Sequence, residues 1–120
     1  MHWNSLLAVA AGGALGSVGR FALNELLPFD PNRWAWATFA ANMLGCLCMG
    51  VLAPKLTSPE LRLFAITGIL GGFTTFSGLG LEIFKYIQGS NFILALGYGL
   101  SSLLLGTVLV FTGNKIAVLW

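Results

Sequence analysis

The stretch Gly68-Ile69-Leu70-Gly71-Gly72-Phe73-Thr74-Thr75-Phe76-Ser77-Gly78 decides the fold, because it interrupts an otherwise apolar run from Leu63 to Leu81. Glycine, threonine and serine all lower helix propensity, so a helix is weakened here. Inside a bilayer, irregular backbone is tolerated only where it is buried in protein or lines a water-filled path. We therefore expect a spanning helix that is broken in mid-membrane. The carbonyl and amide groups that such a break exposes can bind ions.

A second interpretation of these glycines is close helix packing, since small residues four apart let two backbones approach each other. The pattern occurs at Gly68 and Gly72, at Gly12 and Gly16, and in Ser102-xxx-Gly106. We favour packing for the pair at Gly12 and Gly16. For the later cluster we favour a functional break, because polar threonine and serine adjoin the glycines.

Composition places the whole chain in a membrane. Its 120 residues are 57% hydrophobic and only 8% charged, whereas an ordinary soluble domain is about a quarter charged. A soluble enzyme is therefore excluded, and the one histidine, His2, leaves neither a nucleophile–base pair nor a metal-ligand set. The net charge of +2 is too small for a nucleic-acid partner.

The length allows about four spans of roughly 20 residues each with short loops. We expect a single domain, residues 1–120, that is all-α, with helices at about 6–27, 34–53, 60–87 and 92–113. The prolines and polar residues of Pro28–Asn32 end the first helix, and the second is expected to end before Pro54. Aromatic side chains of an interfacial belt fall near the span ends, at Trp3, Trp34, Trp36, Tyr86 and Trp120.

The positive charges do not favour one orientation. Lys55, Arg62 and Lys115 fall on one side of the membrane, and on the other are Arg20, Arg33 and Lys85. Because an excess of positive charge normally fixes the cytoplasmic side, an even split predicts insertion both ways. Two copies can then pair antiparallel, as the halves of inverted-repeat transporters do. The alternative is an orientation set by something that the count misses.

Polar residues within the spans indicate where a ligand passes. Thr38 and Asn42 are four apart on one helix face, and so are Tyr98 and Ser102 on another. Neutral hydroxyl and amide donors replace the hydration of a small anion, and the positive ring edge of Phe76 suits an anion too. The alternatives are an interhelical hydrogen bond for Asn42 and packing or lipid exposure for Phe76.

Four segments in order resemble the Fluc (CrcB) fluoride channels of bacteria. They are the glycine-rich Gly12–Phe21, the segment Ala37–Gly45 that contains Asn42, the interrupted segment Thr67–Ser77, and the pair Tyr98 and Ser102. The resemblance covers the whole chain.

This resemblance implies an antiparallel, dual-topology homodimer that exports fluoride passively through two pores in the bacterial cytoplasmic (inner) membrane. It implies one central Na⁺ held by backbone carbonyls of Gly71 and Thr74 of each subunit, and Arg20 at a pore vestibule. The resemblance assigns the fluoride pore to Asn42, Phe76, Tyr98 and Ser102, and a polar track along the third helix to Thr75, Ser77 and Glu82. Thr38 is added to the pore because it shares the helix face of Asn42.

Three positions differ from the family pattern. Leu79 stands where the family usually has a second phenylalanine, Gly78 where it often has threonine, and Ala37 where it has glycine. Leucine has no electropositive ring edge, so we expect a working channel with altered throughput.

Two other functions fit part of the sequence. A small multidrug exporter has this length and topology, but it needs an acidic residue within the first helix; Val9–Gly19 has none, and Glu25 lies near the helix end. A structural subunit of a larger membrane complex fits the glycine faces, but it leaves Asn42 and the interruption at Thr74–Ser77 unexplained.

Overall fold

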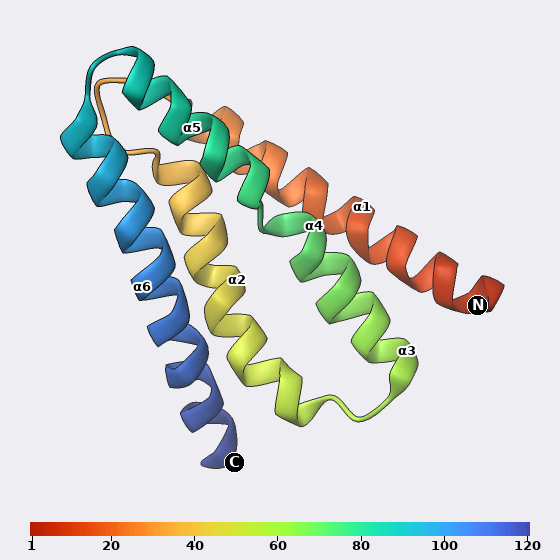
Figure 1. Cartoon of the computed structure of the whole chain (residues 1–120). Helices are drawn as coiled ribbons and strands as arrows, with labels where there is room; N and C mark the ends of the chain where they lie inside the picture. Colours follow the sequence, from red (N-terminus) through yellow and green to blue (C-terminus); the bar gives the residue numbers. More distant parts are fainter.

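The computed structural model describes residues 1–120 and is entirely helical (Figure 1). Four helical units are long and apolar enough to cross a membrane, as the sequence predicts. The first two are α1 (Trp3–Leu26) and α2 (Trp36–Lys55), and the fourth is α6 (Phe92–Val118). The third unit, Pro59–Gln88, is assembled from several shorter helices.

The third span is broken, which confirms the expected interruption. It comprises α3 (Pro59–Arg62), the π-helical η1 (Leu63–Leu70), α4 (Gly71–Phe73) and α5 (Phe76–Gln88). Thr74 and Thr75 between α4 and α5 have extended backbone, with ψ angles of 154° and 121°. The Thr75 hydroxyl oxygen then accepts a hydrogen bond of 2.9 Å from the Gly78 amide and so caps α5. The break therefore lies at the threonines, after the glycines.

Helix ends differ from the expected ones in a few places. The expected end of the second helix before Pro54 is wrong, because α2 includes both Pro54 and Lys55. Proline lacks only its own amide donor, and the amide of Leu56 still closes the final turn on the Leu52 carbonyl at 2.9 Å. Helix α6 continues to Val118, five residues beyond the expected Gly113.

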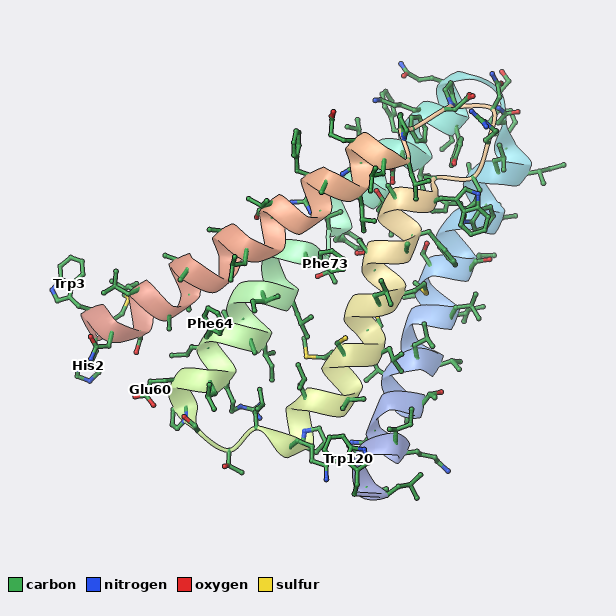
Figure 2. All side chains as sticks on the ribbon, turned by 180° about the vertical axis from the view of Figure 1, so that it is seen from behind. His2, Trp3, Glu60, Phe64, Phe73 and Trp120 are labelled. Atoms are coloured by element: carbon green, nitrogen blue, oxygen red, sulfur yellow. The ribbon has the colours of Figure 1, made fainter.

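Glycines bring α1 against the first half of the third span. Gly12 and Gly16 are buried, and a Cβ on either would collide with backbone, at the Phe64 carbonyl and the Ile69 carbonyl respectively. Gly72 lies equally close, with the Gly13 carbonyl oxygen 2.6 Å from where its Cβ would stand. The packing interpretation thus holds for the first pair and accounts for Gly72 as well. Figure 2 shows this stretch, between the labelled Phe64 and Phe73, beside α1.

A second glycine contact joins α2 to α6. A Cβ on Gly50 would collide with the Val110 carbonyl, and one on Gly113 would collide with the Leu47 carbonyl. The chain therefore consists of two tightly packed pairs, α1 with η1 and α4, and α2 with α6, joined by looser contacts. The break lies where these two pairs meet (Figure 1).

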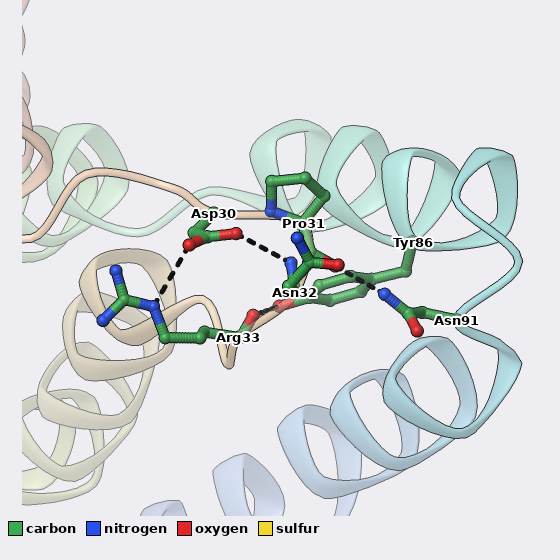
Figure 3. A network of polar contacts seen from close by, with 6 residues as sticks. All are labelled: Asp30, Pro31, Asn32, Arg33, Tyr86 and Asn91. Carbon is green, nitrogen blue, oxygen red and sulfur yellow. Dashed lines mark hydrogen bonds and ion pairs between the residues drawn. The ribbon is translucent and has the colours of Figure 1, made fainter.

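One end of the bundle is closed by the α1–α2 loop and the α5–α6 turn. The Tyr86 hydroxyl donates to the Arg33 carbonyl at 2.6 Å, and the side-chain amide of Asn91 donates from Nδ2 to the Pro31 carbonyl at 2.8 Å (Figure 3). Tyr86 is fully buried. Tyr86 does lie near the end of a span, as expected, but its ring is enclosed by the fold and packs against Phe29. Three of the other belt residues, Trp3, Trp36 and Trp120, are exposed.

The opposite end carries the α2–α3 loop. Arg62 donates from Nη1 to the Ala53 and Leu56 carbonyls at 2.6 and 2.9 Å, and so ties α3 to the end of α2. The Lys55 ammonium lies 4.4 Å from the centre of the Trp120 ring. Lys55, Arg62 and the end of α6 thus share one end of the bundle, as the four-span order predicts.

Candidate functional site

The break leaves backbone groups without their helical partners, and Asn42 satisfies one of them, the Thr75 amide, while also bonding to the Thr75 carbonyl. In an uninterrupted helix the Thr75 amide would bond to the Gly71 carbonyl. Instead it donates to Asn42 Oδ1 at 2.8 Å, while Asn42 Nδ2 donates to the Thr75 carbonyl at 3.1 Å. The side-chain amide therefore pairs with Thr75 as another peptide group would. The second N–H of Nδ2 has no partner in the chain, and Asn42 also lines a groove.

Arg20 satisfies a second orphaned group. The Gly72 carbonyl would accept from Phe76 in a continuous helix, and here it accepts from Arg20 Nε at 3.2 Å. Arg20 follows Gly12 and Gly16 at intervals of four residues on α1, so the close glycine contact carries its half-buried side chain to the break.

Three carbonyls at the break, those of Gly71, Phe73 and Thr74, have no hydrogen-bond donor. Helix geometry would assign the Thr75 amide to Gly71 and the Gly78 amide to Thr74, but those amides bond to Asn42 and to the Thr75 hydroxyl. Thr74 itself gives both its amide and its hydroxyl to the Leu70 carbonyl, at 3.0 and 2.8 Å. Carbonyl oxygens are the ligands that a hard cation prefers, so the Gly71 and Thr74 carbonyls suit a sodium ion chemically.

Glu82 forms a closed polar cluster inside the chain. Thr38 Oγ1 donates to Glu82 Oε2 at 2.9 Å, and the Tyr98 hydroxyl donates to Glu82 Oε1 at 2.8 Å. All three side chains are buried. Each carboxylate oxygen therefore has a hydroxyl partner, which is what a buried carboxylate requires. Three of the residues expected at the pore thus meet in one cluster, although they come from α2, α5 and α6.

Phe76 lies in a different environment, on an open face of the chain. It is 86% exposed, the first residue of α5 after the break. Two hollows adjoin it. One, of about 260 Å³, runs along α2 past Asn42 and the break, and the other, of about 280 Å³, runs towards α6 and Ser102. Leu79 lines both hollows together with Phe76.

Ser102 is the only hydroxyl-bearing residue that α6 contributes to the lining of these hollows. It is 6% exposed, and its Oγ is buried without a hydrogen-bond partner. A buried hydroxyl without a partner is uncommon and calls for an explanation. Tyr98 and Ser102 share a buried face of α6 as predicted, but the structure separates their surroundings, since Tyr98 bonds to Glu82 and Ser102 faces the hollow beside Phe76.

The remaining track residues do not form one continuous chain of bonds. The hydroxyls of Thr75 and Ser77 lie 3.3 Å apart at the start of α5. No hydrogen bond within the chain links either of them to Glu82, which lies on the buried side of α5.

Sequence reasoning missed part of the groove wall. Gly45, Cys46 and Met49 line the hollow beside the break, and the Thr74 methyl fills the space that a Cβ on Gly45 would need. Their spacing was the available signal, because Cys46 and Met49 follow Asn42 by four and seven residues and so share its helix face.

The fold and the site define a class. This is a multi-pass membrane protein with a broken third span and hollows lined by neutral donors. The family described as "CrcB-like protein, Camphor Resistance (CrcB)" matches residues 7–114, and the chain belongs to this family.

Similar proteins of bacteria match most or all of the chain. A protein of Chlorobium phaeobacteroides is 36% identical and covers 99% of this chain and 97% of its own length. One of Chlorobaculum tepidum is 38% identical over 100% of this chain and 99% of its own, and one of Nocardia farcinica is 43% identical over 87% and 74%. Each carries the name fluoride-specific ion channel FluC, so the relatives are named as channels and not as enzymes.

Proposed function

We propose that this protein is a fluoride-specific channel that lets fluoride leave the cell passively across the cytoplasmic membrane. The two hollows that share Phe76, together called the groove, carry the proposal. Between them they bring together the Phe76 ring, a free amide N–H on Asn42 and the residue Ser102, whose hydroxyl has no partner. The names of the relatives point to the same ion.

The chemistry of the groove favours a small, strongly hydrated anion. Such an ion needs donors that replace its water, and amide and hydroxyl groups supply them. A ring edge carries the positive end of the aromatic quadrupole and adds attraction without a full charge. No lysine or arginine lines either hollow, so no fixed cation traps the ion, and conduction needs sites that also release it.

We further propose that two copies pair antiparallel and that each pair holds two pores. The near-even division of positive charge between the two ends supports insertion in both directions. The exposure of Phe76 supports a partner surface, because a groove of donors open to lipid would be costly. A second copy would cover it.

A sodium ion would be held at the two-fold axis of this pair by the Gly71 and Thr74 carbonyls of both copies. Four carbonyl oxygens suit a hard cation, and the ion would supply positive charge that neutralises the carbonyl dipoles where the two breaks meet. Within one chain, Asn42 and Arg20 bond to Thr75 and Gly72 and leave the Gly71 and Thr74 carbonyls free.

Electrode-monitored efflux from proteoliposomes tests the channel. Vesicles loaded with fluoride or with chloride, and carrying the purified protein, should release fluoride much faster than chloride. Equal leakage of both ions, or fluoride release at the rate of protein-free vesicles, would overturn the proposed function.

Orientation is tested separately. A protease site is added after Trp120, and sealed vesicles are prepared from the membranes of the expressing cells. Treated from outside, about half of the molecules should be cut, because a chain without charge bias inserts both ways. Cutting of all molecules, or of none, would contradict dual insertion and leave the efflux result standing.

A further inference from the structure

We propose that Arg20 is a positioning residue for the break: by holding the Gly72 carbonyl, it keeps the neighbouring Gly71 and Thr74 carbonyls as the cation ligands. The inference rests on the proposed sodium site and assigns it a residue from α1. It starts from the 3.2 Å hydrogen bond between Arg20 Nε and the Gly72 oxygen.

The break releases several carbonyls at once, so something has to decide which of them meet the cation. Gly71, Gly72, Phe73 and Thr74 all lose the amide that helix geometry would give their carbonyls, since the chain is extended at Thr74 and Thr75 and the Gly78 amide bonds to a hydroxyl. Four free oxygens in four residues would offer a cation several geometries. The bond from Arg20 removes the Gly72 oxygen from this set.

The two sides of the break are held by different helices. Arg20 on α1 holds Gly72, before the extended residues, and Asn42 on α2 holds Thr75 with two hydrogen bonds. The Thr74 backbone lies between these two anchors, and its side chain is fixed by its bond to Leu70 and by contact with Gly45. The position of the Thr74 carbonyl therefore depends on both anchors.

The position of Arg20 follows from the glycine face of α1. Gly16, one turn earlier, lets the α1 backbone touch Ile69 and Phe73 directly. An arginine four residues further on then reaches Gly72 with its side chain half-buried. A charged side chain at this depth is expensive, and its bond to an orphaned carbonyl gives it a structural reason to be there.

Three substitutions separate the hydrogen bond from the charge. Arg20→Gln places an amide nitrogen at the same number of bonds from Cα as Arg Nε, so it keeps the donor and removes the charge. Arg20→Lys keeps the charge but places a methylene at that position. Arg20→Met keeps neither. Arg33→Gln is the control, because it removes an arginine from the exposed α1–α2 loop.

Backbone hydrogen exchange in sodium-free buffer is the first measurement. The amides of Thr74 and Thr75 are bonded within the break, so loosening Gly72 should expose them. We expect exchange at these amides to be about tenfold faster in Arg20→Met and Arg20→Lys, and unchanged in Arg20→Gln and Arg33→Gln, tenfold being about 1.4 kcal/mol of opening free energy. The proposal would be overturned if the exchange rate of these amides were unchanged in Arg20→Met. It would also be overturned if the rate rose as much in Arg20→Gln as in Arg20→Met.

The thermal midpoint against NaCl concentration, at constant ionic strength with choline, is the second measurement. Arg20→Met and Arg20→Lys should need about tenfold more Na⁺ than the native protein for the same rise in midpoint, because binding shifts the midpoint by mass action, and Arg20→Gln should respond as the native protein does. If Arg20→Met does not fold, Arg20→Lys against Arg20→Gln makes the same comparison. A native protein that ignores Na⁺ would refute the proposed sodium site, and the exchange experiment would still decide whether Arg20 holds the break.

Discussion

The closed cluster at Glu82 and the open groove at Phe76 are both polar regions of the same broken span, but only one is completed by the chain itself. Both Glu82 carboxylate oxygens have hydroxyl partners from other helices. Beside Phe76, the Ser102 hydroxyl is buried with no partner and the ring is exposed. A satisfied cluster stabilises the fold, whereas unsatisfied donors beside a hollow are available to a ligand. The two regions should therefore respond differently to substitution.

The largest effect is expected at the open groove. Phe76→Ile removes the ring edge from both hollows at once, so fluoride efflux should fall at least about tenfold, or ~1.4 kcal/mol in barrier height. The fold of each chain should not change, because the ring is exposed in the single chain; since the proposed second copy would cover the ring, the variant is compared as a folded dimer. Phe84→Ile on the same helix is the control, since Phe84 is also exposed but lines neither hollow. Normal efflux from Phe76→Ile would mean that the ring does not contact the ion and serves only for packing or faces lipid.

The closed cluster should respond in stability. Tyr98→Phe removes the donor to Glu82 Oε1 and leaves a buried oxygen unpaired, which costs about 1–3 kcal/mol. Denaturant unfolding in detergent should detect this loss. Thr112→Val serves for comparison, because its exposed hydroxyl bonds only to its own helix, and it should change little. Equal stability of Tyr98→Phe and the native protein would mean that the cluster is not held as described.

Ser102→Ala sharpens the contrast, because it removes a buried hydroxyl that has no partner to lose. Unfolding stability should stay the same or rise, since no hydrogen bond is broken. Fluoride efflux should fall about fivefold, which corresponds to one hydrogen bond of roughly 1 kcal/mol. A clear loss of stability together with normal efflux would show that the Ser102 hydroxyl stabilises the fold, and it would contradict the assignment of Ser102 to the groove.

Leu79→Phe adds a second ring to the open groove, because Leu79 lines both hollows with Phe76. An aromatic edge contributes up to about 1 kcal/mol, so efflux should rise about two- to fivefold. Leu79→Met is the matched variant, since it fills the same space without a ring edge and should leave efflux near the native rate. An equal rise in both variants would point to side-chain volume as the cause.

The smallest effect is expected outside both regions, at the exposed pair of Asp30 and Arg33 (Figure 3). The hydrogen bond from the Asn32 amide, followed by that from Arg33, holds the pKa of Asp30 below its usual range. A lowered carboxyl pKa gives stability that is present above the usual pKa and lost as pH falls through the lowered one. The contribution of the pair should therefore be constant from about pH 6 to 8, where Asp30 stays charged. Because exposed pairs contribute little, Asp30→Asn should have nearly the same thermal midpoint as the native protein over this range. A clear drop at neutral pH would show that the loop contributes more than its exposure indicates.

Much of the fold follows from local pattern. The four spans and the interruption of the third are written in runs of apolar residues and in glycine next to threonine, which are local properties of the chain. The exact site of the break was less predictable. Glycine lowers helix propensity, yet Gly68 and Gly72 remain helical because α1 packs against them. The interruption falls instead at Thr74 and Thr75, where Asn42 replaces the missing backbone partner.

The candidate site divides in the same way. Spacing placed Thr38 with Asn42 and Tyr98 with Ser102 on common faces, since residues four apart share a helix side. Spacing does not say which helix each face meets. Tyr98 points to Glu82 while Ser102, one turn further, borders the hollow at Phe76, and this separation depends on where α5 crosses α6.

The sequence by itself determined that this is a membrane protein with four spans and that its third span is interrupted. Hydropathy and helix propensity act over short stretches, so both features can be read locally. The tertiary structure alone decided how the break is used. Arg20 and Asn42 lie 52 and 33 residues from the backbone groups that they hold. The glycine contacts of α1 bring Arg20 to the break, and the packing of α2 beside Thr74 at Gly45 brings Asn42 there. Both are tertiary contacts, and a hydrogen bond needs its two atoms within about 3 Å of each other.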